Sequence, residues 1–267
     1  MSATVVAPAA DMRVTLPRVV RAEWIKFRSL RSTVITLLVA MVMVVGFGVL
    51  ITSLRDTGQG PGRGLADPTS LSLGGATLAA LAVGVLGVLT AAGEYSTGSI
   101  RATFSAVPAR LPVLWAKAAV FAAVTFVTML ASVFAAFLAG QAILHANGHA
   151  YASLSDAGVL RAVIGAAVYL TGAGLIGLAV GALLRNPAGA IATVVGALFV
   201  VPGLTQLLPT DWRDDISPYL PSNTGDSFMT VHTASGALAP WPGLAVYSAY
   251  VVVLLAAAAV LLKRRDA

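Results

Sequence analysis

Six long runs of apolar residues, none interrupted by a charged side chain, set the pattern of this chain. They are residues 33–54, 68–93, 118–144, 162–184, 187–208 and 243–262. An α-helix rises 1.5 Å per residue, so about 20 apolar residues cross the roughly 30 Å hydrocarbon core of a bilayer. The pattern predicts an all-α, polytopic integral membrane protein with six transmembrane helices, over about 33–54, 70–92, 113–144, 162–184, 187–208 and 243–262.

The polar stretches between these runs predict how the spans connect. Residues 1–17 are small and polar, which indicates a flexible N-terminal tail, and we expect residues 18–267 to form a single transmembrane domain. Only Arg185 and Asn186 separate the fourth span from Pro187, so these spans must form an antiparallel hairpin. Asn186 suits the N-cap and Pro187 the first helical position of the fifth span.

Residues 18–32 form a basic, amphipathic stretch before the first span. Val20, Trp24 and Phe27 repeat at helical spacing among basic residues. Such a helix lies along the membrane, with tryptophan at headgroup level and basic side chains extended towards water. A plain basic flank that fixes topology is the alternative. The residues assigned to this interfacial helix are Val20, Arg21, Glu23, Trp24, Lys26, Phe27 and Arg28.

A second amphipathic helix is predicted between the second and third spans, within residues 93–117. The apolar residues at positions i, i+4 and i+7 that share one of its faces are Ile100, Phe104 and Val107. Ser96 or Thr97 can cap its start. Pro108 ends it, because proline disfavours the helical conformation of the preceding residue.

The composition excludes a soluble domain. Hydrophobic residues make up 58% and charged residues 10% of the chain, against about 45–50% and 25% in soluble proteins. A net charge of +6 would suggest nucleic acid, but 13 of the 17 Lys and Arg residues lie on the side of the predicted spans that holds both termini. The positive-inside rule places that side in the cytoplasm. We therefore expect a multi-pass protein of the plasma (cell inner) membrane that contacts lipids and binds no nucleic acid.

Catalytic and metal-binding patterns are missing from the sequence. Cysteine is absent, and the helix-breaking pair Asn147 and Gly148 separates His145 from His149, with no acid nearby to complete a metal site. No span contains a nucleophile with a paired base. We expect neither enzyme activity nor a cofactor or metal in this chain.

Small residues recur at helix-packing spacing in the fourth and fifth spans. Gly177 and Gly181 form a GxxxG pair, and Gly189 and Gly196 are seven residues apart. Glycines let transmembrane helices approach closely. We expect these positions to pack helices together, within the chain or across a dimer.

The lack of charge in the six apolar runs also bears on the energy source. Ionisable residues in mid-membrane mark proton and ion pathways, and each costs about 2.5–3.5 kcal/mol to insert. The six apolar runs contain none, and the chain lacks a GxxxxGK[ST] phosphate-binding loop. Uphill transport would need energy from another polypeptide. The alternatives are a secondary carrier or channel that works without an ATPase, and a membrane scaffold or intramembrane enzyme.

Three stretches carry a family resemblance: AEWIKFRS before the first span, GEYSTGSIRATFSAVPAR between the second and third, and PYLPSN in the loop at 209–242. Together they resemble the ATP-binding-cassette (ABC) type-2 transporter permeases of high-GC bacteria, over essentially the whole chain. The most specific part is the series Glu94, Tyr95, Gly98, Arg101, Pro108, Ala109 and Arg110.

The resemblance implies a permease subunit of an ABC exporter. Two copies of the permease would assemble with two copies of a separate ATPase subunit that binds ATP and magnesium. The segment between spans 2 and 3 would enter a groove on the ATPase as a cytoplasmic coupling helix, and short helices between spans 5 and 6 would cap the exit.

On this hypothesis the apolar face of the coupling helix packs into the ATPase groove. Arg101 and Arg110 meet acidic groups there, and Glu94 holds the base of the segment against the basic arm. Movement passes into the spans through turns at Gly93 and Pro112. The residues assigned to ATPase coupling are Glu94, Tyr95, Thr97, Gly98, Ile100, Arg101, Phe104, Val107, Pro108 and Arg110.

Overall fold

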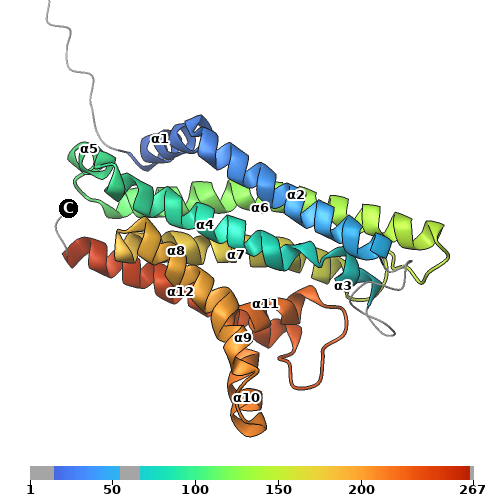
Figure 1. Ribbon diagram of the computed structural model, residues 1–267. Coiled ribbons are helices and arrows are strands. Elements are labelled where there is room, and N and C mark those ends of the chain that lie inside the picture. The colour runs from blue at the N-terminus through green and yellow to red at the C-terminus, as the bar shows by residue number, and fades with distance from the viewer. Residues whose placement is uncertain (1–14, 55–66, 265–267) are drawn as a thin grey trace, which may run out of the picture.

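A computed structural model describes residues 15–54 and 67–264 of the chain. All regular elements within these two ranges are helices (Figure 1). Six helical runs are long and apolar enough to cross a membrane, which confirms the predicted number and order of spans. They are α2 (Arg31–Leu54), α4 (Gly75–Ser96), α6 (Leu111–Ala146), α7 (Val159–Leu184), the continuous run from α8 to α9 (Pro187–Thr205) and α12 (Pro240–Arg264).

Shorter helices lie at the two ends of this bundle. α1 (Leu16–Ser29) and α5 (Ser99–Ala106) lie at the end where α12 finishes, here called the terminal end (Figure 1). The other short helices are α3 (Pro68–Ser72), α10 (Thr210–Ile216), the 3₁₀-helix Ser217–Tyr219 and α11 (Pro221–Met229). The predicted tail at 1–17 lies mostly outside the described residues, and its last two residues already belong to α1.

The second predicted span, 70–92, is divided and shifted in the structure. α3 is a separate helix capped by Asp67, whose carboxylate accepts a hydrogen bond from the Ser70 backbone N–H at 3.1 Å. α4 then starts at Gly75, where a Cβ would lie 2.5 Å from the Met43 carbonyl oxygen of α2. α4 continues through Gly93 to Ser96, so the turn predicted at Gly93 is wrong.

The core is built on the contact between α4 and α7, where backbone meets backbone. A Cβ at Gly177 would overlap the carbonyl oxygen of Gly84, and one at Gly181 would lie 2.8 Å from the carbonyl oxygen of Val88. Only glycine permits this approach, because any side chain would force the helices apart. The packing role predicted for Gly177 and Gly181 is confirmed within the chain.

Gly189 and Gly196 do not take part in such packing. A Cβ at Gly196 would meet no atom of the described chain within 4 Å, and one at Gly189 would meet only the Asn186 side chain, at 3.8 Å. Gly196 instead begins a π-helix (Gly196–Val200) that joins α8 (Pro187–Val195) to α9 (Val201–Thr205). Packing within the chain is therefore wrong for these two glycines, and packing across a dimer stays a prediction.

The hairpin between α7 and α8 forms as the sequence predicts. Arg185 takes the left-handed backbone conformation, with φ 55°, that ends α7. The Asn186 side chain accepts a hydrogen bond from the Gly189 N–H at 3.0 Å, and Pro187 opens α8. The two spans are therefore antiparallel.

In the chain, α11 follows the fifth span and precedes the sixth. It packs against α7 and α12. Gly225 lies on the Tyr169 ring so closely that a Cβ would overlap it. Arg161 of α7 donates hydrogen bonds to the carbonyl oxygens of Phe228 and Thr230, at 3.3 and 3.0 Å. These contacts hold α11 in the bundle rather than out in a loop.

Candidate functional site

Four charged side chains meet at the terminal end of the bundle. Lys117 Nζ donates to Glu23 Oε2 at 2.7 Å and to Glu94 Oε1 at 2.8 Å. Lys26 Nζ donates to Glu23 Oε1 at 2.8 Å and to Glu94 Oε1 at 3.2 Å. We call Glu23, Lys26, Glu94 and Lys117 the four-charge cluster. It joins α1, α4 and α6, and its formal charges sum to zero.

α1 contributes two members because its buried face is mixed. Val19, Glu23 and Phe27 follow one another at i, i+4 and i+8 and are all buried. Lys26 is three residues from Glu23, so it reaches the same side of the helix. Phe27 packs edge-on against Phe121 of α6, with ring centroids 6.0 Å apart. α1 is therefore anchored by one aromatic contact and two charges.

Of the three apolar residues Val20, Trp24 and Phe27, only Phe27 packs in the protein core, and the placement of Trp24 at headgroup level stays a prediction. Trp24 is 44% exposed, and Val20 is only half-buried. Arg21 and Arg28 are exposed as expected. The apolar periodicity did not show the buried face because that face carries Glu23, whose charge is matched by residues far away in sequence.

Glu94 reaches the cluster from the last turn of α4. The helix ends at Ser96, and Gly98, with φ 73°, turns the chain into α5. No side chain caps the start of α5, and Thr97 instead closes α4, so the predicted cap at Ser96 or Thr97 is wrong. The left-handed turn at Gly98 is the actual joint between span and loop helix, since glycine adopts this conformation without strain.

Lys117 comes from α6, which is much longer than a span requires. Its 36 residues extend about 54 Å at 1.5 Å per residue, against roughly 30 Å of hydrocarbon. Lys117 is in the second turn of this helix, and Arg110, with φ 52°, precedes the first turn. The helix can therefore place Lys117 near a membrane surface and still cross the bilayer.

Mutual pairing makes the burial of these charges tolerable. The side chains of Glu23 and Lys117 are 4% and 8% exposed. Removing one partner of such a pair typically costs about 3–5 kcal/mol, because the other charge stays buried and unpaired. The cluster is thus a strong positional constraint between α1, α4 and α6.

The electrostatics of the cluster favour the charged forms on α1. Burial alone would raise the pKa of Glu23, but Lys117 and then Lys26 outweigh it, and the pKa lies below its ordinary value of 4.5. Burial alone would lower the pKa of Lys26, but Glu23 and Glu94 raise it above 10.5. Both groups are therefore ionised at neutral pH.

α5 lies over the cluster with its apolar face turned inward. Ile100 and Phe104 are 7% and 8% exposed and belong to the protein's own core, and the half-buried Val107 packs against that core. The prediction that Ile100 and Phe104 fill a groove on another protein is therefore wrong, whereas a partner contact of Val107 stays a prediction. Thr103 follows Ile100 by about one helical turn, and its Oγ1 accepts a hydrogen bond from Lys26 Nζ at 3.1 Å.

The outward face of α5 and the turn after it are polar and small. The exposed residues here are Ser99, Arg101, Ala102, Ser105, Ala106, Pro108 and Ala109. Arg110 instead turns back, with its guanidinium 5.5 Å from the centroid of the Phe104 ring. At the neighbouring hairpin, the Arg185 guanidinium lies 5.1 Å from the centroid of the Tyr95 ring. Cation–π contacts at this range tie the turns to the bundle.

Of the residues assigned to coupling, Glu94 lies in the cluster and contacts the basic arm through Lys26, as the hypothesis for Glu94 requires. Gly98 forms the joint, whereas Arg101 and Pro108 remain exposed. Lys117 and Thr103 were missed. A single lysine inside an otherwise apolar helical run was the available signal, because a charge there needs a partner.

A cavity of about 570 Å³ adjoins the cluster. It is bounded by the junction of α1 with α2, the end of α4, the start of α5, and α6. Glu94 and Thr103 line it together with apolar residues of the spans.

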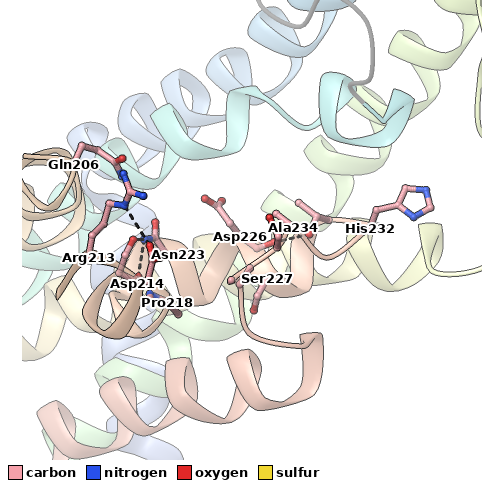
Figure 2. Close-up of a pocket in the computed structure, with 14 residues that line it drawn as sticks. Gln206, Arg213, Asp214, Pro218, Asn223, Asp226, Ser227, His232 and Ala234 are labelled. Carbon is pink, nitrogen blue, oxygen red and sulfur yellow. Dashed lines mark hydrogen bonds and ion pairs between the residues drawn. The ribbon is translucent and has the colours of Figure 1, made fainter. Parts of the chain in front are cut away.

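A second, polar cavity of about 310 Å³ lies between α9, α10, α11 and the loop after α11 (Figure 2). Asn223 closes one side by donating to the Ser217 backbone oxygen at 2.7 Å. Asp226 points into the central space in Figure 2, whereas His232 points away from it. No group of three or more His, Cys, Asp or Glu side chains that could hold a metal ion occurs in residues 15–54 and 67–264.

Comparison with models of known protein families and with curated protein sequences found no match to this chain.

Proposed function

We propose that this protein is the permease subunit of an ABC exporter, which acts as a homodimer with a separate ATPase subunit that binds ATP and magnesium. In this proposal the terminal end faces the cytoplasm across the plasma (cell inner) membrane. The excess of basic residues on that side supports the orientation. The chain itself would form the translocation path and catalyse no reaction.

The four-charge cluster is the observation that supports this proposal most. It fastens the arm α1 to the end of α4 and to the second turn of α6. Lys26 also donates a hydrogen bond to Thr103, which belongs to α5. A force applied to α5 would reach two spans and the arm together. This is the property that a coupling element requires.

The burial of Ile100 and Phe104 changes how the coupling would work. The ATPase would contact the exposed face, with Arg101, Ser105 and Pro108, and not the apolar face. Ile100 and Phe104 would carry the movement inward, because close-packed side chains transmit displacement. Gly98, and not Gly93, would absorb the change of angle between α4 and α5.

The distribution of ionisable side chains also supports an external energy source. In the described part of the six spans, acidic, basic and histidine side chains lie within two turns of the helix ends. Ion-coupled carriers use such groups at mid-membrane. An ATPase that acts on α5 would make them unnecessary.

Charge reversal on the exposed face of α5 tests the proposal. Arg101 lies in the first turn, where glutamate suits the helix dipole, so Arg101→Glu keeps the helix. With the ATPase subunit that the proposal requires, we expect co-purification to fall by about tenfold or more, since interfacial charge reversal costs several kcal/mol. Arg213→Glu on α10 is the matched control and should leave the complex intact. Equal recovery of the ATPase with wild type and Arg101→Glu would refute the proposed contact.

A further inference from the structure

The 570 Å³ cavity beside the four-charge cluster has the size of a small-molecule site. Ligand cavities in proteins typically measure about 300–1,000 Å³. Coupling of α5 to the spans does not require this space, because the contacts that fasten α1, α4, α5 and α6 lie around it.

The surface of the cavity is mostly apolar, although serine and threonine side chains and the four-charge cluster also line it, and it opens towards the outside of the bundle. Phe27 and Val120 are buried behind it, whereas Leu30 and Leu89, at 53% and 39% exposed, border its opening. Hydrocarbon chains fit such a lining, because the water that would otherwise wet it is released. The location beside a spanning helix makes the cavity accessible from a bilayer.

The polar end of the cavity is the carboxylate of Glu94, and half of it is unused. Its Oε1 accepts from both lysines, but its Oε2 is buried and accepts no hydrogen bond from the described residues. Lys26 donates three hydrogen bonds, its full capacity, to Glu23, Glu94 and Thr103, and Lys117 donates two, to Glu23 Oε2 and Glu94 Oε1. A buried acceptor left unpaired costs about 1–3 kcal/mol. Glu94 Oε2 is therefore suited to a donor that comes from outside the chain.

We infer that this cavity binds an amphiphile whose head group, an alcohol or an amine, donates a hydrogen bond to Glu94 Oε2 while its alkyl chain lies between Phe27, Leu89 and Val120. A head group without an N–H or O–H, whether an anion or a quaternary ammonium, should bind less tightly, because it supplies no donor to Glu94 Oε2. A water molecule would satisfy the oxygen but leave the apolar walls hydrated. The inference requires no ATPase and is independent of transport.

Equilibrium binding to the chain alone tests this inference. The protein is placed in nanodiscs of phosphatidylcholine, whose head group has no N–H or O–H donor. The radiolabelled probes are dodecanol, dodecylamine, dodecyltrimethylammonium and dodecane sulfonate, with partition into empty nanodiscs subtracted. We expect saturable binding of dodecanol, dodecylamine or both, at least about tenfold tighter than of the other two, a gap of about 1.4 kcal/mol.

The pattern among the probes decides the outcome. Tight binding of dodecanol alone would identify a neutral donor, and tight binding of dodecylamine alone would identify an ammonium. Tight binding of both would show that the donor matters and the charge does not. Equal binding of all four probes, preference for either probe without a donor, or no saturable binding would overturn the inference.

Two variants locate the site. Thr90→Phe places a ring in the cavity, one helical turn before Glu94, and should weaken binding about tenfold or more, by about 1.4 kcal/mol. Thr128→Phe is matched to it: both hydroxyls bond a carbonyl four residues earlier, and both residues are half-buried on spanning helices. Unchanged binding in Thr90→Phe, or an equal loss in both variants, would contradict the assigned site.

Discussion

Lys117 Nζ lies 2.7 Å from Glu23 Oε2, although the two residues are 94 positions apart in the chain. Both side chains are almost fully buried, and each also bonds a further member of the four-charge cluster. The pair fixes the N-terminal arm to the third span. In the proposed function, this contact makes the arm part of the moving unit and not merely a topological flank.

Removing the lysine should destabilise the protein strongly. Lys117→Met would leave two buried carboxylates, Glu23 and Glu94, with Lys26 as the one remaining cation of the cluster, at a cost of about 3–5 kcal/mol in the free energy of unfolding. Lys263→Met, an exposed lysine of α12, is the control and should change stability by less than about 0.5 kcal/mol. Denaturant titration in detergent measures both. In a double-mutant cycle, Glu23→Gln should recover part of the loss; strictly additive losses would show that the pair is not coupled.

The docking of α1 should depend on pH at both extremes. The pKa of Glu23 is depressed, so its stabilisation is full above about pH 4.5 and is lost as pH falls through the lower folded-state value. The pKa of Lys26 is raised, so its stabilisation is full below about pH 10.5 and is lost as pH rises through the higher folded-state value.

Protease cleavage after the exposed Arg28 reports release of the arm. The protein is digested briefly at each pH, and the cleaved fraction is normalised to that of an unstructured peptide digested at the same pH. The cleaved fraction should be lowest between these limits, and Glu23→Gln should remove the acidic limb. A cleaved fraction that is the same across the whole range would argue against ionic docking.

The glycine contact between α4 and α7 should tolerate no side chain. Gly177→Ala places a methyl group against the Gly84 carbonyl, and overpacking of this kind costs about 1–3 kcal/mol. Gly196→Ala is the matched control, because its Cβ would meet nothing within 4 Å and alanine favours the helix by up to about 1 kcal/mol. Thermal unfolding in detergent separates them. A destabilised Gly196→Ala would indicate that this glycine packs against a second copy.

Cysteine labelling should establish the orientation of the bundle. The chain contains no cysteine, so single substitutions provide unique reactive sites. Ser105→Cys on α5 and Ser235→Cys in the loop before α12 are both exposed. In intact cells a membrane-impermeant maleimide should label Ser235→Cys and not Ser105→Cys, and permeabilisation should expose both. The reverse pattern would overturn the positive-inside assignment.

Sequence reasoning reached those features that depend on local pattern. The spans follow from uninterrupted apolar runs, and the Arg185–Asn186–Pro187 hairpin follows from capping chemistry that neighbouring residues supply themselves. The packing of Gly177 was also visible, because a GxxxG pair is a local signature of close helix contact.

The candidate site was only partly predictable, because it depends on which distant charges meet. Glu23 interrupts the apolar face of α1 and is stabilised there by Lys117, a pairing that no periodicity reveals. The amphipathic pattern of α5 was read correctly as a helix with one apolar face. That pattern could not show whether the face packs on the protein itself or on a partner.

The most direct test of whether energy enters through α5 is the distance between spin labels attached to Ser105→Cys in two copies of the chain. Pulsed electron paramagnetic resonance measures this distance. Proteoliposomes contain the chain with or without the proposed ATPase subunit. The account predicts one distance distribution without nucleotide and a different one after ATP and magnesium are added, only when the ATPase is present. A distribution that ignores ATP in the full complex, or that shifts with a proton gradient in the chain alone, would contradict it.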